Sequence, residues 1–545
     1  MVRLARQHWP LLVAVAVLCA VVAISVALSL KHNEGHLIYA IDDPYIHMAI
    51  ARNVAEHGVW GVTRYGFTSS SSSLLWTLLL SLVYLLFGVG ESAPLILNIL
   101  SAIGACGLIY ALLQRHRVPP WLTLGALLSI IFFSPWPSLV FCGQEHILHG
   151  LLTIWFVSLA AALLSGDGQT RLRFSALLLL AALVVMARYE GLFAVLVVGG
   201  LFAARRRWVP ALAVVAAGCL PVVTYGMISA AKGWYFLPNP ILLKGNIPDV
   251  SSVKGLVYLL GYSGYLQLTQ NPHMLMLLLA GLVALHYQLR NREGLWREST
   301  VVNAVFVAAT GLHMQFARAG WFYRYEAYLV GLGVFALTLA LKDWLEQGRH
   351  TRMARQELVR YLPLALMSIL VVAPLGVRGI KSFRAIPQAT GNIYQQQYQM
   401  GLFLREFYQG RVVAANDVGA INYLADIRCV DLWGLASLEV AKAMRARRYD
   451  TASIDELVGS KQAEIAVLYD AWFQREDIGG WPSHWLRVGQ WGMPDNLVCC
   501  EDTISFYAVD ESEVEPLIDN LRRFGPRLPE VVVQSGMYMD RESVD

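Results

Sequence analysis

The sequence is poor in charge and in cysteine. Only 15% of its 545 residues are charged, whereas 56% are hydrophobic; an ordinary soluble domain has roughly 25% charged residues. This balance excludes a disordered chain and argues against a purely soluble protein. Seven cysteines in a chain of this length do not indicate a disulfide scaffold, and no CxxC or Cys/His spacing suggests zinc. The small net charge of +4 argues neither for nor against nucleic acid, and we expect no nucleic-acid partner.

The apolar residues gather in long runs between Leu11 and Pro374. Runs of about 15–22 residues match the hydrocarbon thickness of a bilayer. We therefore expect a polytopic α-helical membrane protein. Residues 1–376 would form about 11 transmembrane helices, and residues 377–545 would form a soluble C-terminal domain.

Positive charge is concentrated in alternate connections between these runs. The first run, Leu11–Leu30, follows Arg3 and Arg6 and has no clear cleavage site. We interpret it as a retained transmembrane helix rather than a signal peptide. Because cytoplasmic loops are rich in Lys and Arg, we expect the N-terminus inside. The loops 31–73 and 232–272 and the C-terminal domain would then lie outside the cytoplasmic (inner) membrane of a bacterium.

One stretch, Ser73–Leu113, breaks the alternation. It holds two apolar runs, Leu74–Gly88 and Ala93–Leu113. Two full spans would place the basic Arg115 outside. One span with an interfacial or re-entrant piece would keep it inside, and we favour this second arrangement.

On this topology the unusual polar residues collect at the outer side. Ionisable groups at the edge of a bilayer are costly unless they pair or line a wet cavity. Clusters that are far apart in the sequence but share one face therefore predict one convergent site. Its candidate residues are Asp42, Asp43, His47, Glu145, His146, Arg188, Glu190, Asn239, Lys244, Arg318 and Arg324.

The pair Asp42 and Asp43 precedes a short segment with helical apolar spacing. Capping of that helix by Asp43, with proline next and Gly58 at the end, explains one aspartate. The other carboxylate could be a metal ligand, or a general base that takes a proton from an attacking hydroxyl. His47 can share a helical face with Asp43. It could bind a phosphate or a metal, or simply pair with Asp43.

Two further clusters each allow a structural and a functional interpretation. Glu145 and His146 precede an apolar run and suit the start of a helix. They could also supply metal ligands, although adjacent side chains on a helix diverge. Arg188 and Glu190 lie at the tip of a tight hairpin. They could form a local salt bridge, or Arg188 could hold an anion, since its planar guanidinium binds phosphate with two hydrogen bonds.

The remaining cations lie close to proline or aromatic residues. Asn239 belongs to the rigid stretch Leu237–Pro240, and Lys244 follows it. Lys244 is either a solvated lysine or a phosphate contact. Arg318 and Arg324 flank aromatic residues that are typical of an interfacial belt. The same combination also suits a lipid-linked phosphate next to a sugar.

Taken together, the motifs resemble those of the GT-C superfamily of membrane glycosyltransferases. The closer likeness is to its bacterial branch of protein mannosyltransferases and aminoarabinose transferases. The matching motifs are Asp42-Asp43 with Tyr45–Asn53, Gly143-Gln144-Glu145, Arg188-Tyr189-Glu190-Gly191, Leu237-Pro238-Asn239 with Lys244, Asn416–Ala420 and Val430–Gly434. The resemblance covers essentially the whole chain, but His146 and Tyr189 depart from the usual pattern.

The resemblance implies an inverting transfer of a sugar from a polyprenyl-phosphate carrier to a glycan, lipid or protein acceptor. It implies that Asp42 or Asp43 is the catalytic base. It also implies that the carrier phosphate binds Arg188, Lys244 and Arg324, with Glu145 and Glu190 in support. Some GT-C branches use a divalent metal, so a metal is possible here, and no other cofactor is expected.

The tail from about residue 378 changes sharply in composition. Alternating apolar runs predict strands at 411–415, 428–432, 465–469 and 503–509, and helices at 439–447 and 514–524. We expect a small α/β domain that caps the site or selects the acceptor. A disulfide from Cys429 to Cys499 or Cys500 is possible.

Two other functions remain open from the sequence. A transporter or flippase for a lipid-linked anion would show internal repeats and charged or broken helices at the membrane midplane. No repeat is visible, and the polar groups lie at one face. A non-catalytic membrane receptor would not need both aspartates together with the basic residues.

Overall fold

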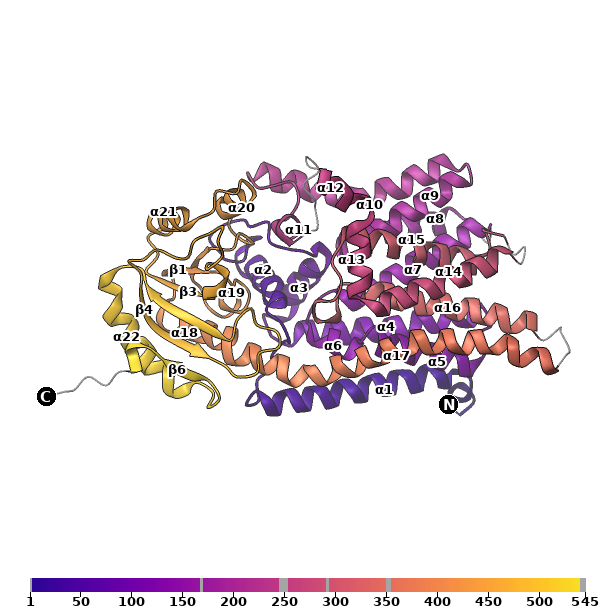
Figure 1. The fold of residues 1–545 in the computed structure, drawn as a ribbon, viewed down its shortest axis with the longest axis horizontal. Coiled ribbons are helices and arrows are strands. Elements are labelled where there is room, and N and C mark those ends of the chain that lie inside the picture. Colours follow the sequence, from indigo (N-terminus) through magenta and orange to yellow (C-terminus); the bar gives the residue numbers. More distant parts are fainter. Residues whose placement is uncertain (1, 167–169, 245–252, 291–293, 349–353, 540–545) are drawn as a thin grey trace.

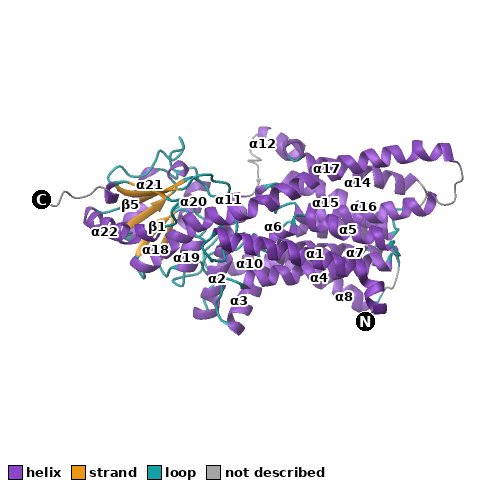
Figure 2. Ribbon diagram, turned by 90° about the horizontal axis from the view of Figure 1, so that it is seen from below, coloured by secondary structure: helices purple, strands orange, loops and turns teal. Residues whose placement is uncertain are grey.

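The chain folds into a long helical bundle with a mixed α/β domain at one end (Figure 1). The computed structural model describes residues 2–166, 170–244, 253–290, 294–348 and 354–539. Strands occur within the C-terminal domain (Figure 2). We call the end of the bundle beside this domain the domain end. The opposite end, where the N-terminus lies, is the far end.

Within the described ranges, seven helices are long and apolar enough to cross a membrane. They are α1 (Val2–His32), α4 (Ala93–Arg115), α7 (His146–Ser165), α10 (Trp208–Ala231), α14 (Pro272–Arg290), α16 (Ala327–Gly348) and α17 (Ala354–Ile393). Beside them run α5 (Pro120–Phe133), α8 (Arg171–Ala187), α9 (Gly191–Ala204) and α15 (Glu298–Phe316). The protein is therefore a multi-pass membrane protein. The number of spans and their orientation in the membrane stay predictions.

Helices α2 (Asp43–His57) and α3 (Leu74–Phe87) lie at the domain end. Near the start of α3, Trp76 Nε1 donates to the carbonyl of Gly143 at 3.1 Å. Just after the end of α3, the carbonyl of Glu91 accepts from the Tyr39 hydroxyl at 2.5 Å. Both ends of α3 therefore stay at the domain end, whereas α4 runs on to the far end. This arrangement agrees with the interpretation of Ser73–Leu113 as one span plus an interfacial piece, and the number of spans in this stretch stays a prediction.

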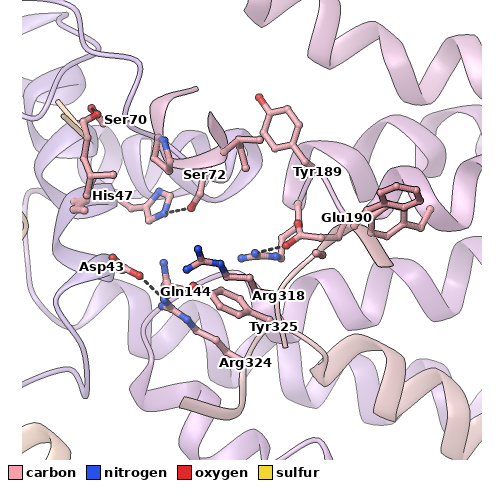
Figure 3. Close-up of a pocket in the computed structure, with 18 residues that line it drawn as sticks. Asp43, His47, Ser70, Ser72, Gln144, Tyr189, Glu190, Arg318, Arg324 and Tyr325 are labelled. Atoms are coloured by element: carbon pink, nitrogen blue, oxygen red, sulfur yellow. Dashed lines mark hydrogen bonds and ion pairs between the residues drawn. The ribbon is translucent and has the colours of Figure 1, made fainter. Parts of the chain in front are cut away.

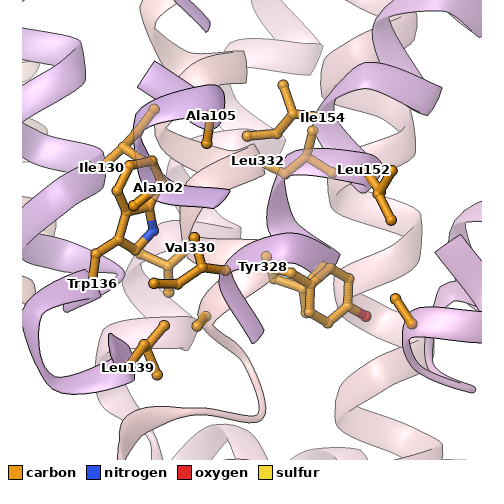
Figure 4. Packing of buried hydrophobic residues seen from close by; sticks show 14 of the residues in the cluster. Ala102, Ala105, Ile130, Trp136, Leu139, Leu152, Ile154, Tyr328, Val330 and Leu332 are labelled. Carbon is orange, nitrogen blue, oxygen red and sulfur yellow. The ribbon is translucent and has the colours of Figure 1, made fainter. Parts of the chain in front are cut away.

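The bundle core combines small and branched side chains from helices that are distant in sequence (Figure 4). Ala102 and Ala105 of α4 are fully buried and allow the neighbouring helices to approach closely. Ile130 of α5 and Ile154 of α7 belong to the same buried cluster. This packing fixes where each helix ends, and hence where the polar loops meet.

The C-terminal domain contains one six-stranded sheet of order β2-β1-β3-β5-β4-β6. Its strands are β1 (Val412–Ala415), β2 (Arg428–Asp431), β3 (Ile465–Leu468), β4 (Leu486–Gly492), β5 (Thr503–Ala508) and β6 (Val533–Ser535). Strand β1 is parallel to β2 and β3, and the other pairs are antiparallel. Helices α18 (Gln399–Phe407), α19 (Ala420–Leu424) and α22 (Val514–Phe524) cover one face. Helices α20 (Leu438–Arg445) and α21 (Thr451–Lys461) cover the other.

The sequence predicted the α/β class of this domain, but it missed two strands and suggested a disulfide. Strand β4 contains two glycines and β6 has only three residues, so neither shows a clear alternating pattern. No disulfide joins any of the seven cysteines, all of which lie within the described residues. Cys499 Sγ instead donates to Gln397 Oε1 at 3.2 Å. The expected boundary at residue 377 falls inside α17, because this helix continues to Ile393.

Candidate active site

A cavity of about 240 Å³ at the domain end brings most of the predicted polar clusters together (Figure 3). Its walls come from α2, from the connections between helices of the bundle and from one residue of the C-terminal domain. The polar residues that line it are Asp43, His47, Ser70, Ser72, Gln144, Arg188, Tyr189, Glu190, Arg318, Arg324 and Tyr325.

Asp43 is the first residue of α2 and faces Arg324 across the cavity (Figure 3). Arg324 donates from Nη2 to Asp43 Oδ2 and from Nη1 to Gln144 Oε1. The Arg324 side chain is 2% exposed, whereas that of Asp43 is 26% exposed. The capping interpretation of Asp43 is wrong, because the N-cap position is Asp42 and its side chain makes no cap hydrogen bond. Asp43 is thus a partly exposed carboxylate that faces a buried guanidinium.

Arg188 ends α8 in an extended conformation and binds two carboxylates. Nη1 donates to Glu145 Oε1 and Nη2 to Glu190 Oε1, each at 2.6 Å. Burial disfavours the charged form of Glu190, but Arg188 outweighs it and lowers the pKa of Glu190 to about 2. Glu190 is therefore ionised at neutral pH, and much of the positive charge of Arg188 is already neutralised.

The connection 317–326, between α15 and α16, supplies two cations and an aromatic ring. Within the described residues, the Arg318 guanidinium has neither a hydrogen bond nor an ion pair, and it points into the cavity (Figure 3). The Tyr325 ring centroid lies 4.9 Å from Cζ of Arg324 and 5.5 Å from Cζ of Arg188. Arg318 is thus the cation that is most available to a negatively charged ligand.

His47 also lines the cavity, but both of its ring nitrogens face hydroxyl groups. Nδ1 lies 2.8 Å from Thr77 Oγ1, and Nε2 lies 3.3 Å from Ser72 Oγ. Burial lowers the pKa of His47, so the neutral ring predominates at pH 7. Sequence reasoning missed Ser70 and Ser72. The run of five serines at 69–73 was the available signal.

Two predicted residues point to the C-terminal domain rather than into the cavity. Asp42 accepts hydrogen bonds from the backbone N–H groups of Gly419 and Ala420, each at 2.8 Å. Burial raises the pKa of Asp42, and the neighbouring Asp417 carboxylate adds to the effect. Asn239 Nδ2 donates to the Gly434 carbonyl at 2.7 Å. Asp42 and Asn239 therefore hold the C-terminal domain against the bundle.

Two of the three remaining candidates, Glu145 and His146, are buried outside the cavity wall. Glu145 lies behind Arg188 and is fully buried. His146 is buried with its ring centroid 6.4 Å from that of Tyr325, and it does not line the cavity. Lys244 is the last residue of α11 (Asn239–Lys244), but its side chain lies outside the described residues. Its phosphate contact stays a prediction.

The donor set of the cavity suits an anion better than a divalent cation. Hard cations need several oxygen ligands, and the two acids of the cavity, Asp43 and Glu190, each bind a guanidinium. Across the described part of the chain, no three His, Cys, Asp or Glu side chains converge as metal ligands. The arrangement therefore suits an anionic ligand that lies next to the partly exposed carboxylate of Asp43.

Comparison with known proteins gives a fold rather than a close relative. Residues 391–507 match a family model described as a domain of unknown function (DUF8728). No curated protein matches the chain in sequence. The archaeal oligosaccharyltransferase AglB from Archaeoglobus fulgidus, in complex with an inhibitory peptide and a dolichol-phosphate, has 14% identity and a TM-score of 0.48. That match covers 86% of this chain and 70% of AglB.

A slightly higher similarity is found to ArnT from Cupriavidus metallidurans, in crystal structures of two states. The form bound to undecaprenyl phosphate has a TM-score of 0.51 and 14% identity, and the match covers 92% of this chain and 98% of ArnT. The apo form has the same TM-score and identity, with coverage of 93% and 99%. The chain is therefore similar in fold to ArnT over most of its length, and the predicted fold class, a helical membrane bundle with a C-terminal α/β domain, is confirmed.

Proposed function

We propose that the protein is an inverting glycosyltransferase. It transfers a sugar from a polyprenyl-phosphate carrier to a hydroxyl group of a glycan, lipid or protein acceptor. The transfer takes place at the domain end of the helical bundle. The observation that carries the proposal is the opposition of Asp43 to Arg318 and Arg324 in one cavity. The fold shared with ArnT, which was solved with undecaprenyl phosphate, supports the choice of carrier.

In this reaction Asp43 is the general base. One of its carboxylate oxygens takes the proton of the acceptor hydroxyl as the acceptor oxygen forms a bond to the anomeric carbon of the sugar. The bond between that carbon and the carrier phosphate breaks, and the polyprenyl phosphate leaves with the electron pair. Attack from the side opposite the phosphate inverts the configuration of the sugar.

The cations hold the leaving group. Arg318 meets the carrier phosphate first, because it has no partner within the described residues. Arg324 then lies between Asp43 and the phosphate, where its charge stabilises the negative charge that develops as the phosphate leaves. Phe193 and Phe316 line the apolar part of the same cavity and suit the first prenyl units.

The C-terminal domain supplies part of the cavity wall. Leu435 belongs to this domain and lines the cavity. Its carbonyl accepts a hydrogen bond from Ser70 Oγ at 2.8 Å. We propose that this wall limits the access of water to the anomeric carbon and so limits hydrolysis of the donor. We propose that this domain also presents the acceptor.

The test compares the two adjacent aspartates in the full-length protein in liposomes, with an undecaprenyl-phosphate sugar as donor. Removal of a general base lowers the rate by roughly 10²–10⁴-fold, so Asp43→Asn should lose activity to that extent. Asp42→Asn should retain most of it, because Asp42 contacts backbone N–H groups of the C-terminal domain. Wild-type transfer rates in Asp43→Asn would reject Asp43 as the base. Movement of the donor across the bilayer without transfer would instead support a flippase.

A further inference from the structure

The connection 317–326 has an unusual backbone. Gly320, Phe322 and Tyr323 have φ angles of 101°, 44° and 62°. Positive φ is easy for glycine but costly for bulky residues such as phenylalanine and tyrosine. Such a conformation persists only where the surrounding structure fixes it. The same turn places Arg318, Arg324 and Tyr325 in the catalytic cavity, so whatever fixes it also fixes the site.

Arg378 of α17 is the cation that fixes this turn. Its Nη2 donates to the Tyr323 carbonyl and to Glu326 Oε1, each at 2.6 Å. Its Nη1 donates to the carbonyl of Phe133, at the end of α5, at 2.7 Å. The side chain of Arg378 is only 5% exposed. One guanidinium thus joins the turn to two helices of the bundle.

Glu326 contacts the other end of the turn, and we call the contacts that Arg378 and Glu326 make with the turn the clamp. It is fully buried, and its Oε2 accepts from the backbone N–H of Gly320 at 2.8 Å. His273 Nε2 lies 3.3 Å from Oε1. Burial opposes ionisation, but Arg378 and His273 outweigh it and hold the pKa of Glu326 well below its usual value. The ion pair therefore holds the turn at Gly320 and at Tyr323, the two sides of the strained segment.

The turn also separates two cavities. Arg324 and Tyr325 face the catalytic cavity. Tyr323, Glu326 and Arg378 line a second cavity of about 580 Å³ on the other side of the turn. Neither Glu326 nor Arg378 lines the catalytic cavity. They can affect the reaction only by holding the wall between the two spaces.

We infer that Arg378 and Glu326 are positioning residues, whose ion pair holds the 317–326 turn so that Arg324 meets Asp43 and Gln144. The inference rests on the proposed function, because it gives the pair a role in the reaction of that site. In the absence of the clamp, the strained backbone would relax and carry Arg318 and Arg324 away from the carboxylate and the phosphate.

The test uses two conservative variants and one matched control. Arg378→Lys keeps the charge but loses the forked guanidinium, and Glu326→Gln keeps the shape but loses the charge. The control is Asp343→Asn at the far end. Asp343 is also buried and accepts hydrogen bonds from Arg297 Nη2 at 2.8 Å and Ser299 Oγ at 2.7 Å. This control removes a buried carboxylate and its ion pair without touching the turn.

We expect kcat/KM to fall by about 10²-fold in both variants, since a small misplacement of catalytic groups has effects of that size. The acid limb of the pH profile should move to higher pH, because a carboxylate that loses a neighbouring cation takes up its proton more readily. Asp343→Asn should leave the acid limb in place. A general loss of stability would lower activity in all three variants without moving the limb.

Amide hydrogen exchange over 317–326 provides a second measurement that is independent of turnover. Faster exchange there in both variants, but not in Asp343→Asn, is the expected result. An unmoved acid limb together with unchanged exchange would overturn the inference. If the wild type transfers no sugar from any polyprenyl-phosphate donor, the proposed function fails. The exchange result alone then supports the clamp or overturns it.

Discussion

The two ends of the helical bundle both contain ion pairs between helices, but they differ in burial. At the domain end, Arg324 and Arg378 are 2% and 5% exposed and bind Asp43 and Glu326. At the far end, Arg115 and Arg297 are each 39% exposed and bind Glu298 and Asp343. Burying a guanidinium costs desolvation energy that the pair itself often does not recover. Such pairs are therefore a poor way to add stability, and their position on the two sides of the 317–326 turn supports the functional role that we propose for them.

At the far end, the same residue types form ion pairs with their neighbours. Arg115, Glu298, Lys342 and Asp343 line a depression in which acids and bases pair locally. Exposed pairs of this kind contribute little to stability. The comparison shows that charge type alone does not define a site. A site is defined by buried charged groups that converge on one cavity. Here the cavity also contains Arg318, a cation that has no ion-pair partner among the described residues.

The largest expected effect on stability compares one arginine from each end. Arg378→Gln leaves the fully buried Glu326 without its guanidinium partner, and breaking a buried pair in this way costs about 3–5 kcal/mol. Arg115→Gln removes a 39% exposed arginine and should cost only about 0.2–1 kcal/mol. Thermal unfolding of the full-length protein in detergent, with both variants measured side by side, provides the check. Equal losses of stability in the two variants would contradict the difference that burial makes between the two ends.

A second prediction concerns two buried acids that differ in their partners, one at the domain end and one in the C-terminal domain. Glu190 binds Arg188, whereas Asp431 accepts from the backbone N–H groups of Trp433 at 2.7 Å and Ala436 at 2.5 Å. Burial raises the pKa of Asp431 to about 6. The native state therefore holds this proton more tightly than the unfolded chain does. The contribution of Asp431 to the free energy of unfolding is full below about pH 4, and about 3 kcal/mol of it is lost as pH rises from about 4 to about 6.

Unfolding of the full-length protein followed between pH 4 and pH 7 would test this sign, with roughly one-unit steps. Asp431→Asn cannot ionise and should show a flatter profile over that range. Asp477→Asn is the control, because Asp477 is an exposed acid that binds Arg475 at the surface. A wild-type stability that falls no more steeply with pH than that of Asp431→Asn would show that the N–H groups outweigh burial.

The smallest expected effect concerns the contact between the two domains. A Cβ atom on Gly419 would overlap the Asp42 carboxylate, so Gly419→Ala should push the C-terminal domain off α2. Overpacking of this kind costs about 1–3 kcal/mol. Gly459→Ala in α21 is the matched control, since a Cβ there meets open space. Cross-linking between α2 and α19 would report the loss of contact. Unchanged cross-linking in Gly419→Ala would show that the domains meet through other contacts.

Much of the architecture could be predicted from the sequence, because it depends on local properties. Long apolar runs and alternating positive charge indicated the bundle and the serpentine order of its loops. The cost of charge near a bilayer indicated a convergent site, and Asp43, Arg188, Arg318 and Arg324 do share one cavity. The short strands β4 and β6 were missed, because they lack the alternation on which such predictions depend.

The roles of individual side chains could not be predicted in this way. Asp42 and Asp43 are adjacent and identical in type, yet one faces Gly419 and the other faces Arg324. Their partners lie hundreds of positions away in the sequence. The two side chains leave the start of α2 in different directions, and this difference decides which partner each one contacts. The importance of Arg378 was equally hidden, because a single arginine in a long helix shows no pattern until the turn at 317–326 packs against it.

The sequence by itself determined that this chain crosses a membrane many times and brings several clusters of acids and cations to one end of the bundle. Hydrophobic length and the cost of burying charge act on each segment separately. Only the tertiary structure decided which aspartate faces a cation and which holds the C-terminal domain. Hydrogen bonds and ion pairs act over a few ångströms, and packing alone brings residues from distant helices within that range.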